Sequence, residues 1–341
     1  MKKIRFIIYA LTIFVISGCN SIEDYDNDNL GNFDALWTFI DGHYCFFKEK
    51  DIDWNAVGEK YRAEAAVAGS QRALFNVMAQ MLNELRDGHV NLSSWFETSY
   101  YRQWWSDYPQ NYDERIIEQY YLNFDYHALG PMYYGILMPY NIGYLRIPTF
   151  ASGLGAGNID YILSYFNLCN GIIIDVRDNG GGDITNVESY VNRFIDQPIV
   201  AGYMMHKTGP GHDDFSEPYE YVYKPAESPH LRWSKPVAVV SNRSTFSAAN
   251  NFVGIMKSLP RVTVVGATTG GGSGMPLSSE LPNGWGVRVS SCRILDPEGK
   301  DTEFGVTPTE GWEVDLDLQM ALMGKDTILE AAIRAVTQCK K

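Results

Sequence analysis

The sequence predicts an α/β protein in which a small helical domain precedes a core domain with a largely parallel sheet. Between residues 143 and 265, short β-branched apolar runs alternate with helical segments, the order expected for parallel strands joined by crossover helices. Before this region, between residues 33 and 86, apolar residues recur every three or four positions. The 341 residues, 45% of them hydrophobic, suffice for one large or two medium domains.

Residues 1–18 have the composition of a secretion signal. A basic start with Lys2, Lys3 and Arg5 precedes an apolar stretch at 6–16 that is too short to span a bilayer, and small residues lead to Cys19. The segment resembles a bacterial lipoprotein signal, which implies that Cys19 is lipidated and becomes the first mature residue. An ordinary signal peptide or an inserted anchor helix is the alternative.

Removal of residues 1–18 leaves 25 Lys and Arg against 41 Asp and Glu, a net charge of −16. Such a surface repels nucleic acid and anionic lipid headgroups, so no nucleic-acid partner is predicted and membrane contact is expected only through the lipid. Residues 19–30 contain an acidic run and are predicted to be a solvated tether. In lipoproteins of Bacteroidetes-like bacteria such a run resembles a surface-export signal; a plain linker is the alternative.

The remaining cysteines give no sign of a metal site, and no cofactor is predicted. Cys45, Cys169, Cys292 and Cys339 are scattered without metal-ligand spacing. Disulfides are permitted outside the cytoplasm, but the sequence does not pair these residues. Cys169 lies in an apolar context and is interpreted as a small buried hydrophobe.

The predicted helical domain spans residues 31–92. Helical periodicity is carried by Phe33, Leu36, Trp37, Ile40 and Tyr44, by Trp54 and Val57, and by Leu74, Val77, Met78, Met81, Leu82 and Leu85. The domain is expected to end at the turn containing Gly88, before a strand at 90–92. Residues 93–142 form an aromatic-rich connecting region, interpreted as a packed interdomain layer or the lining of a peptide groove.

The core domain is predicted over residues 143–341. Its expected strands and helices alternate: strand 143–147, helix 159–166, strand 171–175, a helix after Gly182, strand 237–240, a helix after Ser247 and strand 262–265. Hairpin-like strands at 286–290 and 292–295 and a final helix near 328–336 follow.

Ser247 is the strongest candidate for a nucleophile. It lies where the buried strand 237–240 should pass into a helix, so its hydroxyl would stand beside the backbone N–H groups of the helix N-terminus. The alternative is a serine that only caps the helix.

Three other segments supply candidate partners for this serine. The loop 175–183 contains three consecutive glycines after a strand, which lets backbone N–H groups approach a phosphate or an oxyanion; a tight turn is the alternative. No dinucleotide or Walker spacing is present. His89 is a candidate general base, and Glu303 a candidate carboxylate to orient it, with Asp87 and Asp301 as alternatives.

Together these segments resemble the tail-specific, or C-terminal processing, serine peptidases, including the tricorn-like branch. Six matching pieces occur in the family's order and cover nearly all of residues 30 to 336. They are Asn32-Phe33-Asp34 with Asp53-Trp54, Leu85-Arg86-Asp87-Gly88-His89, Gly143-Tyr144-Leu145-Arg146-Ile147, the loop from Asp175 to Gly182, Thr245-Phe246-Ser247-Ala248, and Glu303-Phe304-Gly305-Val306-Thr307-Pro308.

The resemblance implies a crotonase- or ClpP-like α/β core. It also implies a role for each residue of the site. Ser247 would be the nucleophile, His89 the base and Glu303 the orienting acid. An oxyanion hole would come from the N–H of Ala248 and of a glycine in the loop, Gly181 or Gly182. The implied chemistry is peptide-bond hydrolysis through an acyl-enzyme.

The chain departs from the family pattern at three places. The processing branch places a lysine 25 residues after the serine, but that position is Gly272, which favours the serine–histidine–glutamate arrangement of the tricorn-like branch. Asn250 stands three residues after the serine, where members of the family often have a glutamate. About 50 residues separate His89 from Gly143, too few for a typical PDZ domain beside the other elements.

The sequence therefore predicts a lipid-anchored, extracytoplasmic serine peptidase acting on peptides or proteins. An inactive family member that binds a peptide or surface ligand is the alternative, and an accessory lipoprotein of a carbohydrate system is a further one. A separation of Ser247 and His89 beyond about 8 Å would favour a binding role, because a base must come within hydrogen-bond reach.

Overall fold

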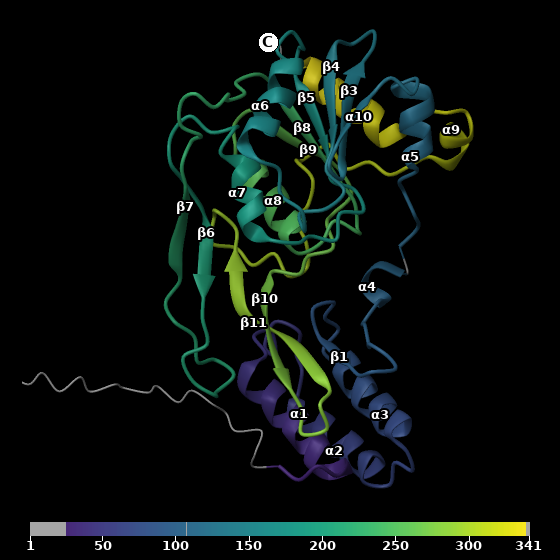
Figure 1. Ribbon diagram of the computed structural model, residues 1–341, viewed down its shortest axis with the longest axis vertical. Coiled ribbons are helices and arrows are strands. Elements are labelled where there is room, and N and C mark those ends of the chain that lie inside the picture. Colours follow the sequence, from purple (N-terminus) through teal and green to yellow (C-terminus); the bar gives the residue numbers. More distant parts are fainter. Residues whose placement is uncertain (1–24, 107, 339–341) are drawn as a thin grey trace, which may run out of the picture.

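A computed structural model describes residues 25–106 and 108–338. The predicted signal, Cys19 and Cys339 lie outside the described residues, as does the first part of the tether. An upper body of sheet and helices and a lower body of helices are joined by a long hairpin (Figure 1). The described elements are α1 (Asn29–His43), α2 (Trp54–Ala66), α3 (Gln71–Asn83), β1 (Asn91–Ser93), α4 (Gln103–Ser106), α5 (Glu114–Ile116), the π-helix η2 (Ile117–Tyr121), β2 (His127–Leu129), β3 (Met132–Leu137), β4 (Ile142–Arg146), α6 (Ala156–Tyr165), β5 (Ile172–Asp175), α7 (Ile184–Val191), β6 (Ile199–Met205), β7 (Tyr219–Tyr223), β8 (Val237–Ser241), α8 (Ala248–Lys257), β9 (Val262–Gly266), β10 (Gly274–Glu280), β11 (Gly286–Leu295), α9 (Leu318–Leu322) and α10 (Thr327–Gln338).

The upper body is built on a six-stranded sheet in the order β2-β3-β4-β5-β8-β9. Strand β4 pairs with β5, β5 with β8, and β8 with β9, all in parallel. Strand β3 pairs antiparallel with both β2 and β4. Helix α6 connects β4 to β5 and α8 connects β8 to β9, as the alternation of strands and helices predicted. The predicted α/β fold class with a small helical N-terminal region is confirmed.

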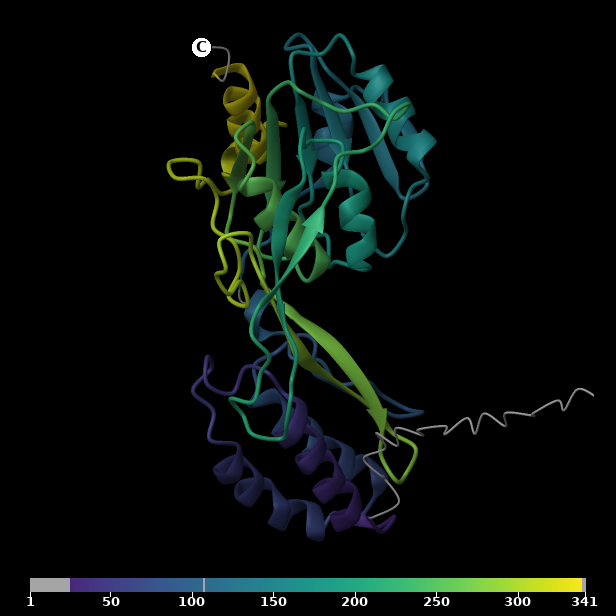
Figure 2. The same cartoon turned by 90° about the vertical axis from the view of Figure 1, so that its left-hand side faces the viewer.

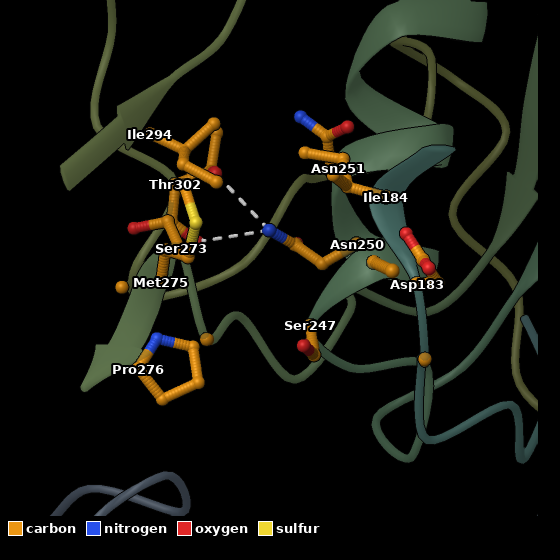
Figure 3. A pocket seen from close by; sticks show the side chains of 14 residues that line it. Asp183, Ile184, Ser247, Asn250, Asn251, Ser273, Met275, Pro276, Ile294 and Thr302 are labelled. Atoms are coloured by element: carbon orange, nitrogen blue, oxygen red, sulfur yellow. Dashed lines mark hydrogen bonds between the residues drawn. The ribbon is translucent and has the colours of Figure 1, made fainter. Parts of the chain in front are cut away.

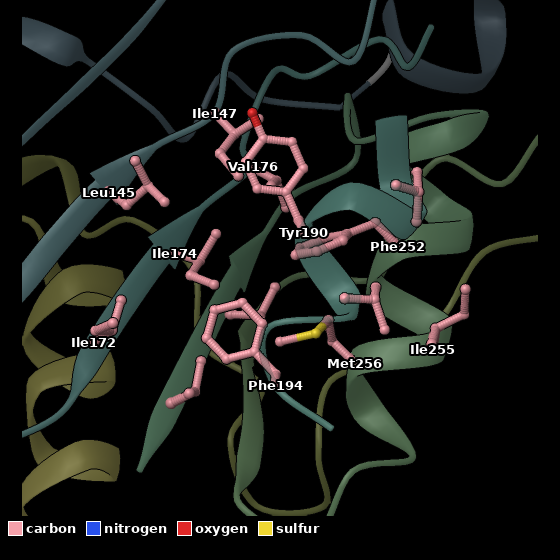
Figure 4. Close-up of a cluster of buried hydrophobic side chains, with 14 of the residues drawn as sticks. Leu145, Ile147, Ile172, Ile174, Val176, Tyr190, Phe194, Phe252, Ile255 and Met256 are labelled. Atoms are coloured by element: carbon pink, nitrogen blue, oxygen red, sulfur yellow. The ribbon is translucent and has the colours of Figure 1, made fainter. Parts of the chain in front are cut away.

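Side-chain alternation along the central strands gives the sheet two buried faces. Ile172 and Ile174 of β5 pack into one core with α6, α7 and α8, while Ile173 between them packs into a second core with α10. Figure 4 shows the first core, to which Ile172, Ile174, Phe194 and Met256 all contribute. A strand buried on both faces needs apolar residues at every position, which explains the continuous run at 172–174.

Helices α1, α2 and α3 form the lower body, as the periodicity predicted, and they bury a third core with β11. Helix α1 begins earlier than expected, inside the predicted tether. The side chain of Asp28 accepts a hydrogen bond of 2.7 Å from the N–H of Gly31 and so caps the helix. Asp28 was predicted to belong to the solvated tether, yet aspartate is a favoured capping residue, so the end of the predicted tether is structured.

A second sheet joins the two bodies. Strands β10 and β11 form a long antiparallel hairpin that reaches from the upper body to the helices (Figure 2), and β11 also pairs with β1 and β6. Two strands were expected at 286–290 and 292–295, but residues 286–295 form the single strand β11. Its true partner β10 was not predicted, nor were β6 and β7, which form the rest of this sheet.

The aromatic-rich region 93–142 contains short helices and two strands that belong to the main sheet. Strand β3 pairs with β4, and its Tyr133 and Tyr134 are buried on opposite faces. The aromatic residues of this strand thus extend both cores, which favours packing over the lining of a groove.

The cysteines within the described part are not paired. Cys45, Cys169 and Cys292 are free and buried, and Cys169 packs in the apolar core as interpreted. Over residues 25–106 and 108–338, no helix combines the length and apolar character needed to cross a bilayer.

Candidate active site

Ser247 lies at the corner between β8 and α8 in an uncommon backbone conformation. Its φ of 58° and ψ of −124° are rare for a residue with a side chain and store of the order of 1–3 kcal/mol of strain. The N–H of Ser247 donates to the carbonyl of Gly271 at 2.8 Å, which fixes the turn. The side chain makes no capping hydrogen bond to α8, so the hydroxyl is available for another partner.

That partner is His89, which lies 158 positions earlier in the chain. Its Nε2 is 2.9 Å from the Oγ of Ser247, well inside hydrogen-bond reach. The imidazole is 4% exposed and lies against the ring of Phe246, with 4.7 Å between centroids. A serine hydroxyl in contact with a neutral imidazole can lose its proton as it attacks, which is the arrangement of a serine hydrolase.

The buried position keeps this imidazole neutral. Burial is the main cause that lowers the pKa of His89 to about 4, and Arg288 and Lys50 lower it further, while Asp87 opposes them. Among the described residues, the Nδ1 of His89 is buried without a hydrogen-bond partner. The ring is thus a proton acceptor at neutral pH, and no carboxylate bonds directly to its far side.

Glu303 is buried near the site but bonds to other groups than His89. Its Oε1 lies 2.7 Å from the Nζ of Lys50, and its Oε2 accepts from the N–H of Ser273 at 2.9 Å. Burial, together with the charge of Asp87, raises the pKa of Glu303 to about 8. The direct contact with His89 that an orienting acid makes is replaced here by a contact with Lys50.

Asp87 lies closer to the histidine and is bonded from three sides. Its Oδ1 accepts from the backbone N–H of His89 at 2.8 Å, and its Oδ2 accepts from the hydroxyl of Tyr44 at 3.1 Å and lies 3.4 Å from Lys50. Although burial alone would raise it, Lys50 and His89 lower the pKa of Asp87. Asp301, the other alternative, bonds instead to Ser273 and Arg293.

The glycine loop after β5 packs directly against Ser247. A side chain at Gly181 would lie 2.7 Å from the Cβ of Ser247 and 2.9 Å from the backbone nitrogen of Ala248. The N–H of Gly181 donates to the side chain of Asn179, so it is already engaged. Gly182 and Ala248 both line the cavity at Ser247.

We expect Gly182→Ala to destabilise the protein by at least about 2 kcal/mol, because the φ of 144° suits only glycine and the added carbon would meet the backbone nitrogen of Ala151 at 2.0 Å. Urea unfolding followed by tryptophan fluorescence measures the change. Gly180→Ala is the matched control, since nothing lies within 4 Å of its added carbon and its φ is not positive. Equal stabilities of the two variants would contradict the expectation.

A cavity of about 220 Å³ opens beside Ser247 (Figure 3). Asn250 reaches across it and donates to the hydroxyl of Thr302 at 3.0 Å. The wall is contributed by the glycine loop, α8, the start of β10 and the end of β11: Gly182, Asp183, Ile184, Ser247, Ala248, Asn250, Asn251, Gly272, Ser273, Gly274, Met275, Pro276, Ile294 and Thr302. No group of three or more His, Cys, Asp or Glu that could hold a metal ion occurs in the described part of the chain.

Gly272 cannot be replaced by a lysine base without rearrangement. Its φ is 79°, and a side chain there would lie 2.4 Å from the ring of Phe246, the same ring that packs on His89. The place of a lysine is thus filled by an aromatic ring, and the group in contact with Ser247 is the imidazole of His89.

Sequence reasoning missed two buried charged residues. Lys50 was not singled out, although it contacts both Asp87 and Glu303. Arg177 was included only as part of a loop, yet it is fully buried between Asp175 and Asp326. The available signal for Lys50 was a lysine within the aromatic sequence after α1. The available signal for Arg177 was an acid–arginine pair at the end of a strand.

Comparisons with known proteins agree with this site. Residues 141–311 match the profile of Peptidase family S41, and residues 25–83 match the Tricorn protease C1 domain. The first match covers half of the chain. The chain belongs to peptidase family S41 and is thereby placed among the serine peptidases.

Relatives are found among curated proteins and solved structures. A crystal structure of a candidate peptidase from Parabacteroides merdae is 43% identical, covers 91% of this chain and 97% of its own, and superposes with a TM-score of 0.85. Carboxyl-terminal-processing peptidase 2 of Arabidopsis thaliana is 27% identical over 169 residues, which are 49% of this chain and 31% of that protein. The CtpB protease of Bacillus subtilis is 25% identical over 177 residues, 50% of this chain and 34% of its own. The chain spans about a third of the length of these two curated relatives.

Proposed function

We propose that this protein hydrolyses peptide bonds of extracytoplasmic proteins or peptides through an acyl-enzyme formed on Ser247. The single observation that carries the proposal is the 2.9 Å contact between the Nε2 of His89 and the Oγ of Ser247. The two groups come from segments far apart in sequence and meet beside a cavity large enough for a substrate side chain. The matches to processing peptidases support the same chemistry.

Each group has a role in the proposed reaction. His89 takes the proton of the Ser247 hydroxyl as Oγ bonds to the peptide carbonyl, and it then gives that proton to the departing amine. A water molecule, deprotonated by the same imidazole, releases the acyl group. The N–H groups of Ala248 and Gly182 would stabilise the oxyanion, and the N-terminus of α8 adds its positive dipole end.

Glu303 would contribute to this reaction through its contact with Lys50 rather than by direct contact with the base. Its carboxylate lies against Lys50, which also contacts Asp87, and Asp87 holds the backbone of His89. The cluster therefore connects Glu303 to the loop that carries the base.

The site of action that we propose is the cell envelope. Cys19, once lipidated, would anchor the protein to the outer membrane, facing the periplasm or the exterior. The support is the signal-like sequence before Cys19 and the acidic residues after it.

Labelling with a fluorophosphonate probe tests the proposed nucleophile. Wild type is expected to be labelled on Ser247, and Ser247→Ala to lose the label, because the probe bonds only to an activated hydroxyl. Cleavage of fluorescent casein, measured with the same two proteins, tests peptide-bond hydrolysis. A wild type that neither reacts with the probe nor cleaves casein would support the inactive, peptide-binding alternative.

A further inference from the structure

Lys50 is a charged residue that the proposed reaction leaves without a role. It lies in the turn after α1, in the helical part of the chain, and only 7% of its surface is exposed. Lysine is almost never buried to this extent unless its charge is paired. The ammonium lies 2.7 Å from Glu303 and 3.4 Å from Asp87, and it donates to the carbonyl of Arg86 at 3.2 Å.

These contacts place Lys50 behind the base. Arg86 and Asp87 lie three and two positions before His89 in the chain, and Arg86 returns a hydrogen bond to the carbonyl of Lys50. Asp87 in turn accepts from the backbone N–H of His89. Lys50 therefore contacts two residues of the segment that carries the imidazole, Arg86 and Asp87. Its third partner, Glu303, comes from the loop beyond β11.

We propose that Lys50 is a positioning residue, which fixes the loop carrying His89 and keeps the imidazole in its neutral, proton-accepting form. The inference rests on the proposed function of His89 as base. It makes the helical N-terminal part of the chain a component of the active site, because the ammonium that contacts the loop carrying His89 is supplied from there.

Few charged groups other than Lys50 face the imidazole of His89. Burial is the largest cause that lowers the pKa of His89, and of the charged groups around the ring Asp87 raises it while Arg288 of β11 and Lys50 lower it. Tyr44 and Cys45 also lie at the cluster, but burial raises the pKa of each well above its usual value, so both are neutral. Removal of the ammonium leaves the negative charge of Asp87 to favour the protonated imidazole.

Geometry and charge thus act in the same direction. With Lys50 present, the carboxyl groups of Asp87 and Glu303 share one ammonium, and His89 remains unprotonated at neutral pH. Without it, the local charge becomes more negative, and a positive imidazolium is stabilised even before substrate arrives. The hydroxyl of Ser247 would then lose its proton acceptor at mildly acidic pH.

The pH dependence of the fluorophosphonate reaction tests this role. The second-order rate constant for labelling Ser247 is measured from pH 3.5 to 8 in the full mature chain. For wild type we expect the rate to fall below a midpoint near pH 4, where His89 gains a proton. In Lys50→Met the midpoint should rise by about one pH unit, the effect of one charge several ångströms away, with about tenfold slower labelling on the acidic side.

Two matched variants separate charge from packing. Lys50→Arg keeps the positive charge and should keep the wild-type midpoint. Lys48→Met removes a lysine from the same turn, but Lys48 is exposed and pairs with the exposed Asp213, so the midpoint should not move. If Lys50→Met fails to fold, Lys50→Gln, which keeps hydrogen bonding without the charge, takes its place.

The possible results are distinguishable. A raised midpoint in the uncharged variants alone supports the proposal. A rate that is reduced equally at every pH, with an unmoved midpoint, shows that Lys50 only supports the fold and overturns it. If wild type itself is not labelled at any pH, the proposed function fails first, and the role of Lys50 fails with it.

Discussion

Replacement of His89 by asparagine is expected to lower kcat/KM for casein cleavage by about 10⁴- to 10⁶-fold. Asparagine fills a similar volume, but it cannot accept the proton that leaves the Oγ of Ser247, to which the Nε2 of His89 is hydrogen-bonded at 2.9 Å. KM should change much less than kcat, because the imidazole acts on the proton rather than on substrate binding. Initial rates over a range of casein concentrations separate the two constants.

A double variant makes this prediction sharper. Groups that act as a unit in one chemical step are not additive, so His89→Asn combined with Ser247→Ala should be little slower than Ser247→Ala alone. His43→Asn is the control histidine. It lies at the end of α1 and bonds to the carbonyl of Phe39, and its replacement should leave the rate unchanged. A further large loss in the double variant would mean that the two residues work independently.

Replacement of Arg177 by methionine is expected to lower the free energy of unfolding by about 3–5 kcal/mol. The guanidinium lies 2.5 Å from Asp175 and 2.7 Å from Asp326, and all three side chains are almost completely buried. Methionine keeps much of the volume but removes the guanidinium that pairs with both buried carboxylates, so that Asp326 loses its cation and Asp175 keeps only the influence of Arg146. Because Asp326 also caps α10, the attachment of that helix to the sheet should weaken.

Urea unfolding, followed by tryptophan fluorescence, measures this loss against a surface control. Arg261 pairs with Asp196 at 2.8 Å, but both side chains are partly solvent-exposed, so Arg261→Met should cost less than about 1 kcal/mol. Similar losses in the two variants would mean that burial of the Arg177 cluster does not determine its contribution.

The regular elements were predictable from the sequence to the extent that their pattern is local. Strand β5 follows from three consecutive isoleucines, and α3 follows from apolar residues at helical spacing. Strand β10 contains Gly274 and Pro276 and shows no apolar alternation, so its pairing with β11 depends on the neighbouring strand rather than on its own residues. Strands β6 and β7, in contrast, are rich in β-branched and aromatic residues, so a local strand signal was present there and was missed.

The candidate site was predictable to the extent that a known family's motifs mark it. Ser247 was singled out from its place between a strand and a helix, and the family's motifs then implied the roles of Ser247, His89 and Glu303, which lie within one region of the structure. What each one contacts was not predictable. Glu303 was expected at His89 and lies at Lys50, and Gly181 was offered as an oxyanion donor although its N–H bonds to Asn179.

The sequence by itself determined the fold class, the family and the segments that carry the chemistry, because each is recorded in short stretches of chain. The tertiary structure decided the hydrogen-bond partners, since these depend on how segments far apart in the sequence pack. Lys50 and Glu303 are 253 positions apart and have no shared pattern, yet they form a buried ion pair. In a buried cluster of this kind, the charge on each group is determined by its neighbours in space, and the sequence does not display those neighbours.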